Sequence, residues 1–425
     1  MTNQNKVLVG YKHAKISDYL LVFFLLQFGW ISVLANIRRL ELLILVIIFF
    51  ISYSRNKKVL FDYKIMIMFI IYSSLALIQG MIWGFSIVSL TTSFTIGFLI
   101  PYYFFKVYNL SFFLILEKVI RILTIIALAI WLVQQFVPGA KGLITSIITA
   151  MNRYNETDIT RNMIFYTYWS SLDQNFGLSR NAGFSNEPAA FSVPLILAII
   201  INYSRNLQLF NKKNLVYYFA LITTFSTTGY LAFFPLGLLL LKQRRGRILG
   251  IILFPIFVLS AVYAFNNFEF LQNKINQQIE NQATKEITQS SSGRFLGARR
   301  SLLVLIKYPL HGRGLLAMTK PAVSSDPEYA EYGWLSQMSR FGIIFGALFM
   351  YFFLKGIKRL LESGGYGIYE FVICALSIMI LLSSQPDITG PIFMIFFFLG
   401  LYGYKPYLRK EILIKRKYDI NRFTI

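Results

Sequence analysis

Arg180 and Glu187 lie seven residues apart, where a polar stretch of the chain gives way to a strongly apolar one. Between them, Gly183 allows a sharp backbone turn without a side-chain clash. Pro188 suits the first turn of the helix that we expect to follow. A cation and a carboxylate at the mouth of a membrane helix are costly to place and are therefore often functional. The alternative interpretation is an ion pair that shapes the loop and caps the helix.

Further arginines lie in or near two long polar stretches of the chain. Arginine donates two parallel N–H bonds to phosphate oxygens and stays charged at any working pH, so arginines at a membrane boundary suit a lipid-linked diphosphate. On the helix predicted over 294–307, the arginines at 299 and 300 lie about 140° and 240° from the first one, so they cannot all face one site. Arg299 and Arg340 are better explained as interface anchors. The residues predicted to bind diphosphate are Arg180, Arg294, Arg300 and Arg313.

Two carboxylates are placed to act as a general base, namely Glu187 and Glu331. A carboxylate near arginines stays ionised and can accept a proton from a hydroxyl group. His311 could also accept a proton as a neutral imidazole. The chain has one cysteine and two histidines, and no Asp-rich or Glu-x-x-His pattern, so we expect no metal site, no cofactor and no intramolecular disulfide.

The composition is that of a membrane protein. Of the 425 residues, 56% are hydrophobic and 14% are charged, whereas about a quarter are charged in soluble proteins. Apolar runs near the spanning length recur from end to end. The net charge of +23 could indicate binding to nucleic acid, but 27 of the 42 Lys and Arg residues fall on one side of the predicted topology. This positive-inside pattern indicates contact with anionic lipid and no nucleic-acid partner.

The apolar runs predict an all-α polytopic membrane protein with about twelve spans, a single integral membrane domain over 1–425. Both termini are expected in the cytoplasm, and segments 137–186 and 266–334 are expected to form two large helical periplasmic loops. Segment 215–241 is basic at both ends and contains Ser-Thr-Thr-Gly at 226–229. Each leg of about 18 Å is too short to cross the membrane, so we predict a broken helix pair that lines a protected cavity. The alternative is one long helix with a glycine kink.

Four short motifs of this chain recur in a known family. They are Arg180-Asn-Ala-Gly183 through Glu187-Pro188, Ser226-Thr-Thr-Gly-Tyr-Leu231, Gly293-Arg294 with Pro309-Leu-His-Gly-Arg-Gly314, and Leu335 to Gly342. With two long outer loops and about twelve spans, the chain resembles the bacterial O-antigen polymerase (Wzy) family, within the wider O-antigen polymerase and ligase superfamily. The resemblance covers most of the chain.

The resemblance implies an inverting membrane glycosyltransferase of the GT-C type, in the bacterial inner membrane, with its active site facing the periplasm. It would transfer a growing glycan from undecaprenyl diphosphate to the next lipid-linked repeat unit. Its partners would be the undecaprenyl-diphosphate-linked oligosaccharide, membrane lipids, and a chain-length regulator and flippase of the same pathway. Two positions depart from the pattern: Glu331 stands where ligases usually carry His, and Thr227 stands where many relatives carry Arg.

Two other functions compete with the polymerase. An O-antigen ligase would attach the finished glycan to lipid A-core, and Glu331 in place of His argues against it. A flippase or transporter of the same lipid-linked glycan would also have many spans and central arginines. Transporters more often show internal repeats and short loops, so the two long outer loops favour an enzyme.

Overall fold

The computed structural model describes twelve segments of the chain, and every structural statement below concerns them. These segments are 14–30, 38–55, 62–83, 95–151, 160–162, 166–169, 179–185, 187–206, 209–242, 294–313, 333–384 and 390–403. Their secondary structure is helical apart from one pair of short strands. The predicted helical class is therefore confirmed for this part of the chain.

The helices follow one another with short connections. The first half of the chain forms α1 (Ile16–Trp30), α3 (Arg38–Arg55), α4 (Tyr63–Trp83), the π-helical turn η2 (Thr95–Leu99), α6 (Ile100–Tyr108), α7 (Ser111–Phe136) and α8 (Ala140–Met151). The second half forms α9 (Pro188–Asn206), α10 (Lys212–Thr223), α11 (Thr227–Lys242), α14 (Arg294–Lys307), α15 (Gly333–Ser363), α16 (Ile368–Ser384) and α17 (Pro391–Tyr402). The helix predicted over 294–307 is confirmed as α14.

Three described helices are long and apolar enough to cross a membrane. They are Tyr63–Ile82 of α4, Pro188–Arg205 of α9 and Gln337–Ser363 of α15. Parts of α1, α11, α16 and α17 are equally apolar but shorter. These helices agree with a membrane protein, whereas the number of twelve spans and the GT-C type stay predictions. The span expected at 248–265 lies outside the described residues.

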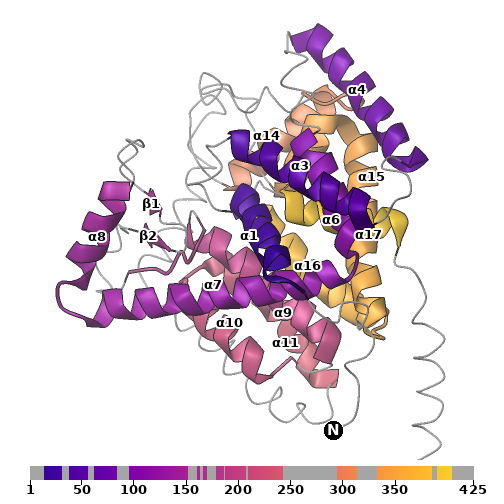
Figure 1. The fold of residues 1–425 in the computed structure, drawn as a ribbon. Coiled ribbons are helices and arrows are strands. Elements are labelled where there is room, and N and C mark those ends of the chain that lie inside the picture. Colours follow the sequence, from indigo (N-terminus) through magenta and orange to yellow (C-terminus); the bar gives the residue numbers. More distant parts are fainter. Residues whose placement is uncertain are drawn as a thin grey trace, which may run out of the picture.

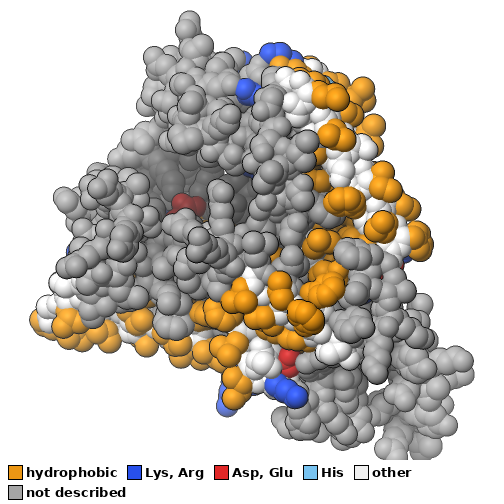
Figure 2. Space-filling view, turned by 45° about the horizontal axis from the view of Figure 1, so that its top comes forward, with side chains coloured by type: hydrophobic (Ala, Val, Ile, Leu, Met, Phe, Trp, Pro, Cys, Tyr) orange, Lys and Arg blue, Asp and Glu red, His pale blue; other side chains and the backbone are white. Residues whose placement is uncertain are grey.

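The core of the fold lies around α9 and α17. Figure 1 shows α9, α10 and α11 grouped together, α15, α16 and α17 on another side, and α4 at the edge of the molecule. The apolar window of α9 is 94% buried and that of α4 only 22%. A helix that is apolar all round is either buried or faces lipid. Figure 2 shows hydrophobic side chains along the outer edge where α4 lies, which suits a lipid-facing helix.

The outer loop predicted over 137–186 is not wholly helical. α8 agrees with the prediction, but β1 (Thr160–Asn162) and β2 (Thr167–Trp169) form an antiparallel pair with Thr160 opposite Trp169. Figure 1 shows α8 and this pair together beyond one end of α7. The helical prediction was wrong for the strands because β2 is built from Thr, Tyr and Trp, which favour extended backbone.

Candidate functional site

The loop before α9 turns as predicted. Gly183 has a φ of +55°, and a Cβ at this position would overlap the ring of Phe191. The carbonyl of Glu187 accepts the first helical hydrogen bond, from Phe191 N at 3.0 Å, and Pro188 follows as the first helical residue. Glu187 is half-buried. Its carboxylate therefore lies at the helix N-terminus, where the macrodipole favours the charged form.

The predicted broken helix pair is confirmed by α10 and α11. The break lies at Thr224–Ser226, and Phe225 has a φ of +46°. The rings of Tyr218 and Phe233, on opposite sides of the break, have centroids 5.2 Å apart. In one straight helix these two residues would be about 22 Å apart along the axis. The two legs therefore fold back on each other, as the basic clusters at both ends of 215–241 predict.

The Arg180 loop binds directly to the tip of this broken pair. Asn181 is fully buried, and its backbone N–H donates to the carbonyl of Thr223 at 2.9 Å. Its Nδ2 donates to Thr223 Oγ1 at 2.9 Å, and Arg180 Nε donates to the carbonyl of Thr224 at 3.2 Å. The last carbonyls of a helix lack partners within the helix, so the loop satisfies the end of α10. We call this contact between 179–185 and 223–226 the first junction.

The other side of the Arg180 loop is bound to the end of α7. The carbonyl of Ser179 accepts from Trp131 Nε1 at 2.8 Å, and its Oγ accepts from Gln134 Nε2 at 2.8 Å. Its backbone N–H donates to Gln135 Oε1 at 3.0 Å. Arg180 is therefore positioned from both sides, by α7 before it and by α10 after it. This double attachment fixes the direction in which the loop leaves the helices.

A second junction forms between the turn after α14 and a kink in α15. Gly342 has a φ of +81°, which separates α15 into two helical parts. A Cβ on Gly342 would overlap the carbonyl of Leu310. At the kink, Ile343 N donates to the carbonyl of Pro309 at 2.8 Å. The sequence placed the turn 309–314 and the start of the next span in separate motifs, and the structure brings them into contact.

Arg313 belongs to this second junction. Its backbone N–H donates to the carbonyl of Ser339 at 2.8 Å, and its Nε and Nη1 atoms are buried. Gln79 of α4 is buried and donates from Nε2 to the carbonyls of His311, at 2.5 Å, and Arg340, at 2.9 Å. A side chain from α4 therefore joins the two chain segments that form the junction.

The remaining predicted site residues are placed as follows. Arg294 begins α14 and Arg300 lies within it. Arg299 is exposed, as expected of an interface anchor. Glu331 lies outside the described residues. The contacts above join Arg180 to α10 and Arg313 to α15, so the common diphosphate site stays a prediction.

Two buried polar residues escaped the sequence analysis. Asn181 lies within the first motif, but its spacing to Thr223 gave no reason to single it out. Gln337 lies in α15 two residues before Ser339 and is fully buried. Neither its Nε2 nor its Oε1 has a hydrogen-bond partner in the described part of the chain. Because a buried amide without partners is costly, Gln337 is a candidate for binding a substrate. A glutamine on an otherwise apolar helix is the signal that could have identified it.

The described segments contain no group of three His, Cys, Asp or Glu side chains that could hold a metal ion. Comparisons of the whole chain with family models, with curated proteins and with solved structures found no match. The function is therefore argued from the residues and contacts described above.

Proposed function

We propose that this chain is a surface-polysaccharide polymerase of the O-antigen type in the bacterial inner membrane. It transfers a growing glycan from undecaprenyl diphosphate to a lipid-linked repeat unit at the periplasmic face, without a cofactor. One observation supports this most directly. The Arg180 loop and the tip of the broken pair α10–α11, two segments predicted to serve one site, are hydrogen-bonded to each other.

The reaction requires charge stabilisation, alignment and one proton transfer. The acceptor hydroxyl oxygen forms a bond to the anomeric carbon while the bond from that carbon to the diphosphate oxygen breaks, with inversion. Arg180, Arg294, Arg300 and Arg313 stabilise the charge that develops on the diphosphate. Glu187 at the start of α9 accepts the hydroxyl proton, with Glu331 as the other candidate. Binding both lipid-linked substrates in one orientation lowers the barrier further.

The decisive experiment uses purified protein and synthetic undecaprenyl-diphosphate repeat units, with neither nucleotide nor added metal ion. A ladder of products that differ by one repeat unit is the expected result. Transfer that occurs only to added lipid A-core would identify a ligase. Movement of the labelled lipid across a vesicle membrane, without a ladder, would identify a flippase. Either of these results would contradict the proposal.

A further inference from the structure

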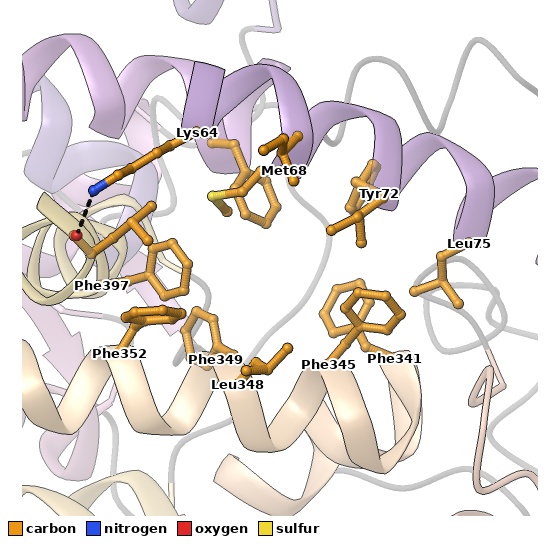
Figure 3. A pocket seen from close by; sticks show the side chains of 14 residues that line it. Lys64, Met68, Tyr72, Leu75, Phe341, Phe345, Leu348, Phe349, Phe352 and Phe397 are labelled. Atoms are coloured by element: carbon orange, nitrogen blue, oxygen red, sulfur yellow. Dashed lines mark hydrogen bonds between the residues drawn. The ribbon is translucent and has the colours of Figure 1, made fainter. Parts of the chain in front are cut away.

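An apolar slot lies between α4 and α15, with α17 at one end. Figure 3 shows side chains from α4 and α15 pointing toward each other across a gap. The cavity has a volume of about 320 Å³, which is within the range of about 300–1,000 Å³ typical of ligand pockets. Its walls include Met68 and Ile71 from α4 and Phe345, Leu348 and Phe349 from α15. The slot therefore offers an apolar ligand contacts on both sides.

Lys64 lies at one end of this slot. Its Nζ is 3.4 Å from the carbonyl of Leu401 and 5.2 Å from the ring centroid of Tyr402. The nearby carboxylate of Asp62 is bound by Lys106 at 2.7 Å. Among the described residues, Lys64 forms no ion pair with a carboxylate. An ammonium group has three N–H donors, so Lys64 can also bind an anion at the slot entrance.

The length of the slot matches one leaflet of a bilayer. It extends along α4 from Lys64 to Leu75, about 16 Å at the helical rise of about 1.5 Å per residue. Half of a hydrocarbon core of about 30 Å is about 15 Å. Near Leu75, the ring of Tyr72 contacts those of Phe98, at 5.5 Å, and Phe341, at 6.3 Å. The cation therefore lies at the boundary end of α4 and the apolar walls extend to about mid-membrane.

We propose that this slot binds an anionic phospholipid. One acyl chain lies between α4 and α15, and the headgroup phosphate contacts Lys64. An undecaprenyl chain is much longer than one leaflet is deep, so most of it would remain outside the slot. In the topology proposed above, Lys64 faces the cytoplasm, and anionic lipids are concentrated in that leaflet. The site is distinct from both junctions, and its test does not depend on the proposed enzyme activity.

The test uses the full-length protein in nanodiscs of phosphatidylcholine with a trace of photoreactive lipid. The photoreactive group is at mid-chain, and the probe carries either a phosphatidylglycerol or a phosphatidylcholine headgroup. We expect the anionic probe to crosslink to α4 and α15 about fivefold more than the neutral one, because one lysine near a membrane surface attracts an anionic lipid by an amount that corresponds to about this ratio. Lys64→Gln should remove this preference, whereas the exposed Lys358→Gln should preserve it.

The slot itself is tested by filling it. Ile71→Trp and Leu348→Trp place a larger ring between the walls and should each reduce crosslinking at α4 and α15 several-fold. Ile70→Trp, on the exposed face of α4 and outside the slot, should not. Equal labelling by both headgroups, or unchanged labelling in both slot variants, would overturn the proposal. Displacement of the probe by undecaprenyl phosphate but not by unlabelled phosphatidylglycerol would also overturn it.

Discussion

Arg180 contacts the carbonyl of Thr224 through Nε, and a guanidinium carries five N–H donors in a rigid fork. One arginine can therefore bind the protein through one edge and phosphate oxygens through another. Asn181 adds two hydrogen bonds to Thr223 from the adjacent position. At the scale of single residues, the loop is positioned by short polar contacts to helix ends, and these leave its charge for a substrate.

Replacing the predicted diphosphate-binding arginines by lysine should remove most activity. Lysine keeps the charge but loses the two parallel N–H bonds. We expect Arg180→Lys and Arg294→Lys each to lower polymerisation about tenfold or more, since a hydrogen bond to a charged group contributes about 1.5–3 kcal/mol. Product ladders from purified variants measure this, with the exposed Arg299→Lys as the control. Near-normal ladders from both variants would reduce these arginines to interface anchors.

Glu187→Gln separates a general base from a structural residue. Glutamine keeps the size and one acceptor oxygen but cannot accept the proton at working pH. We expect turnover to fall while donor affinity is preserved, and Glu331→Gln measured beside it tests the second candidate. A loss of donor binding or of expression would indicate a structural role. Turnover close to that of the parent would show that Glu187 is not the base and direct attention to Glu331 or His311.

Asp62 gives the fold a predictable pH dependence. Burial by itself raises the pKa of this carboxyl, but hydrogen bonds from Lys106, Tyr402 and Ile65 N–H, with the charge of Lys106, together lower the pKa below its ordinary value of 3.8. A lowered pKa in the folded state stabilises the fold above the ordinary pKa, and this contribution is lost as the pH falls through the folded pKa.

The Asp62→Asn variant should therefore unfold at a lower temperature than the parent at pH 7. The difference between the two melting temperatures should shrink as the pH is lowered below about 4, where the parent carboxyl becomes protonated. Thermal unfolding in detergent over this pH range measures both. A difference that is constant down to pH 3 would show that the charge of Asp62 does not contribute.

At the scale of the elements, the site depends on how closely α11 approaches α9. A Cβ added to Gly229, in the first turn of α11, would lie 2.8 Å from Cβ of Ser192 in α9. The two helices can pack at this distance only because Gly229 has no side chain. The first junction lies at the same end of α11, so the position of the break depends on this helix contact.

Gly229→Ala should destabilise the protein by about 1–3 kcal/mol, because overpacking a filled core has about this cost. Gly142→Ala in α8 is the matched control, since a Cβ there meets nothing within 4 Å. Adding Ser192→Gly to Gly229→Ala removes the opposing Cβ and should recover part of the loss. Melting temperatures of the four proteins measure these effects. Equal stability of the two alanine variants would show that α9 and α11 can separate without cost.

At the scale of the whole molecule, the direction of insertion determines which junction faces which compartment. The charge distribution predicts that 137–186 and 266–334 are periplasmic. Single cysteines at Asn155 and Gln282 should react with an impermeant thiol reagent in cells with a permeabilised outer membrane. The native Cys374 is buried and should contribute little background. Protection of both sites would overturn the topology.

The sequence by itself determined the features that depend on local chemistry. Apolar runs predicted the helical membrane class, the helix over 294–307 and the start of α9 at Pro188, because periodicity and proline geometry act within a few residues. Basic clusters at both ends of 215–241 predicted the broken pair, because charge limits which ends can cross a bilayer. The turn at Gly183 followed from its lack of a side chain.

Only the tertiary structure decided which of these segments meet. Asn181 and Thr223 are 42 residues apart, and Gln79 and Arg340 are 261 apart. No spacing rule links residues at such separations, because their contact depends on how whole helices pack. The slot between α4 and α15 likewise exists only because two helices distant in the sequence lie side by side with a gap between their side chains.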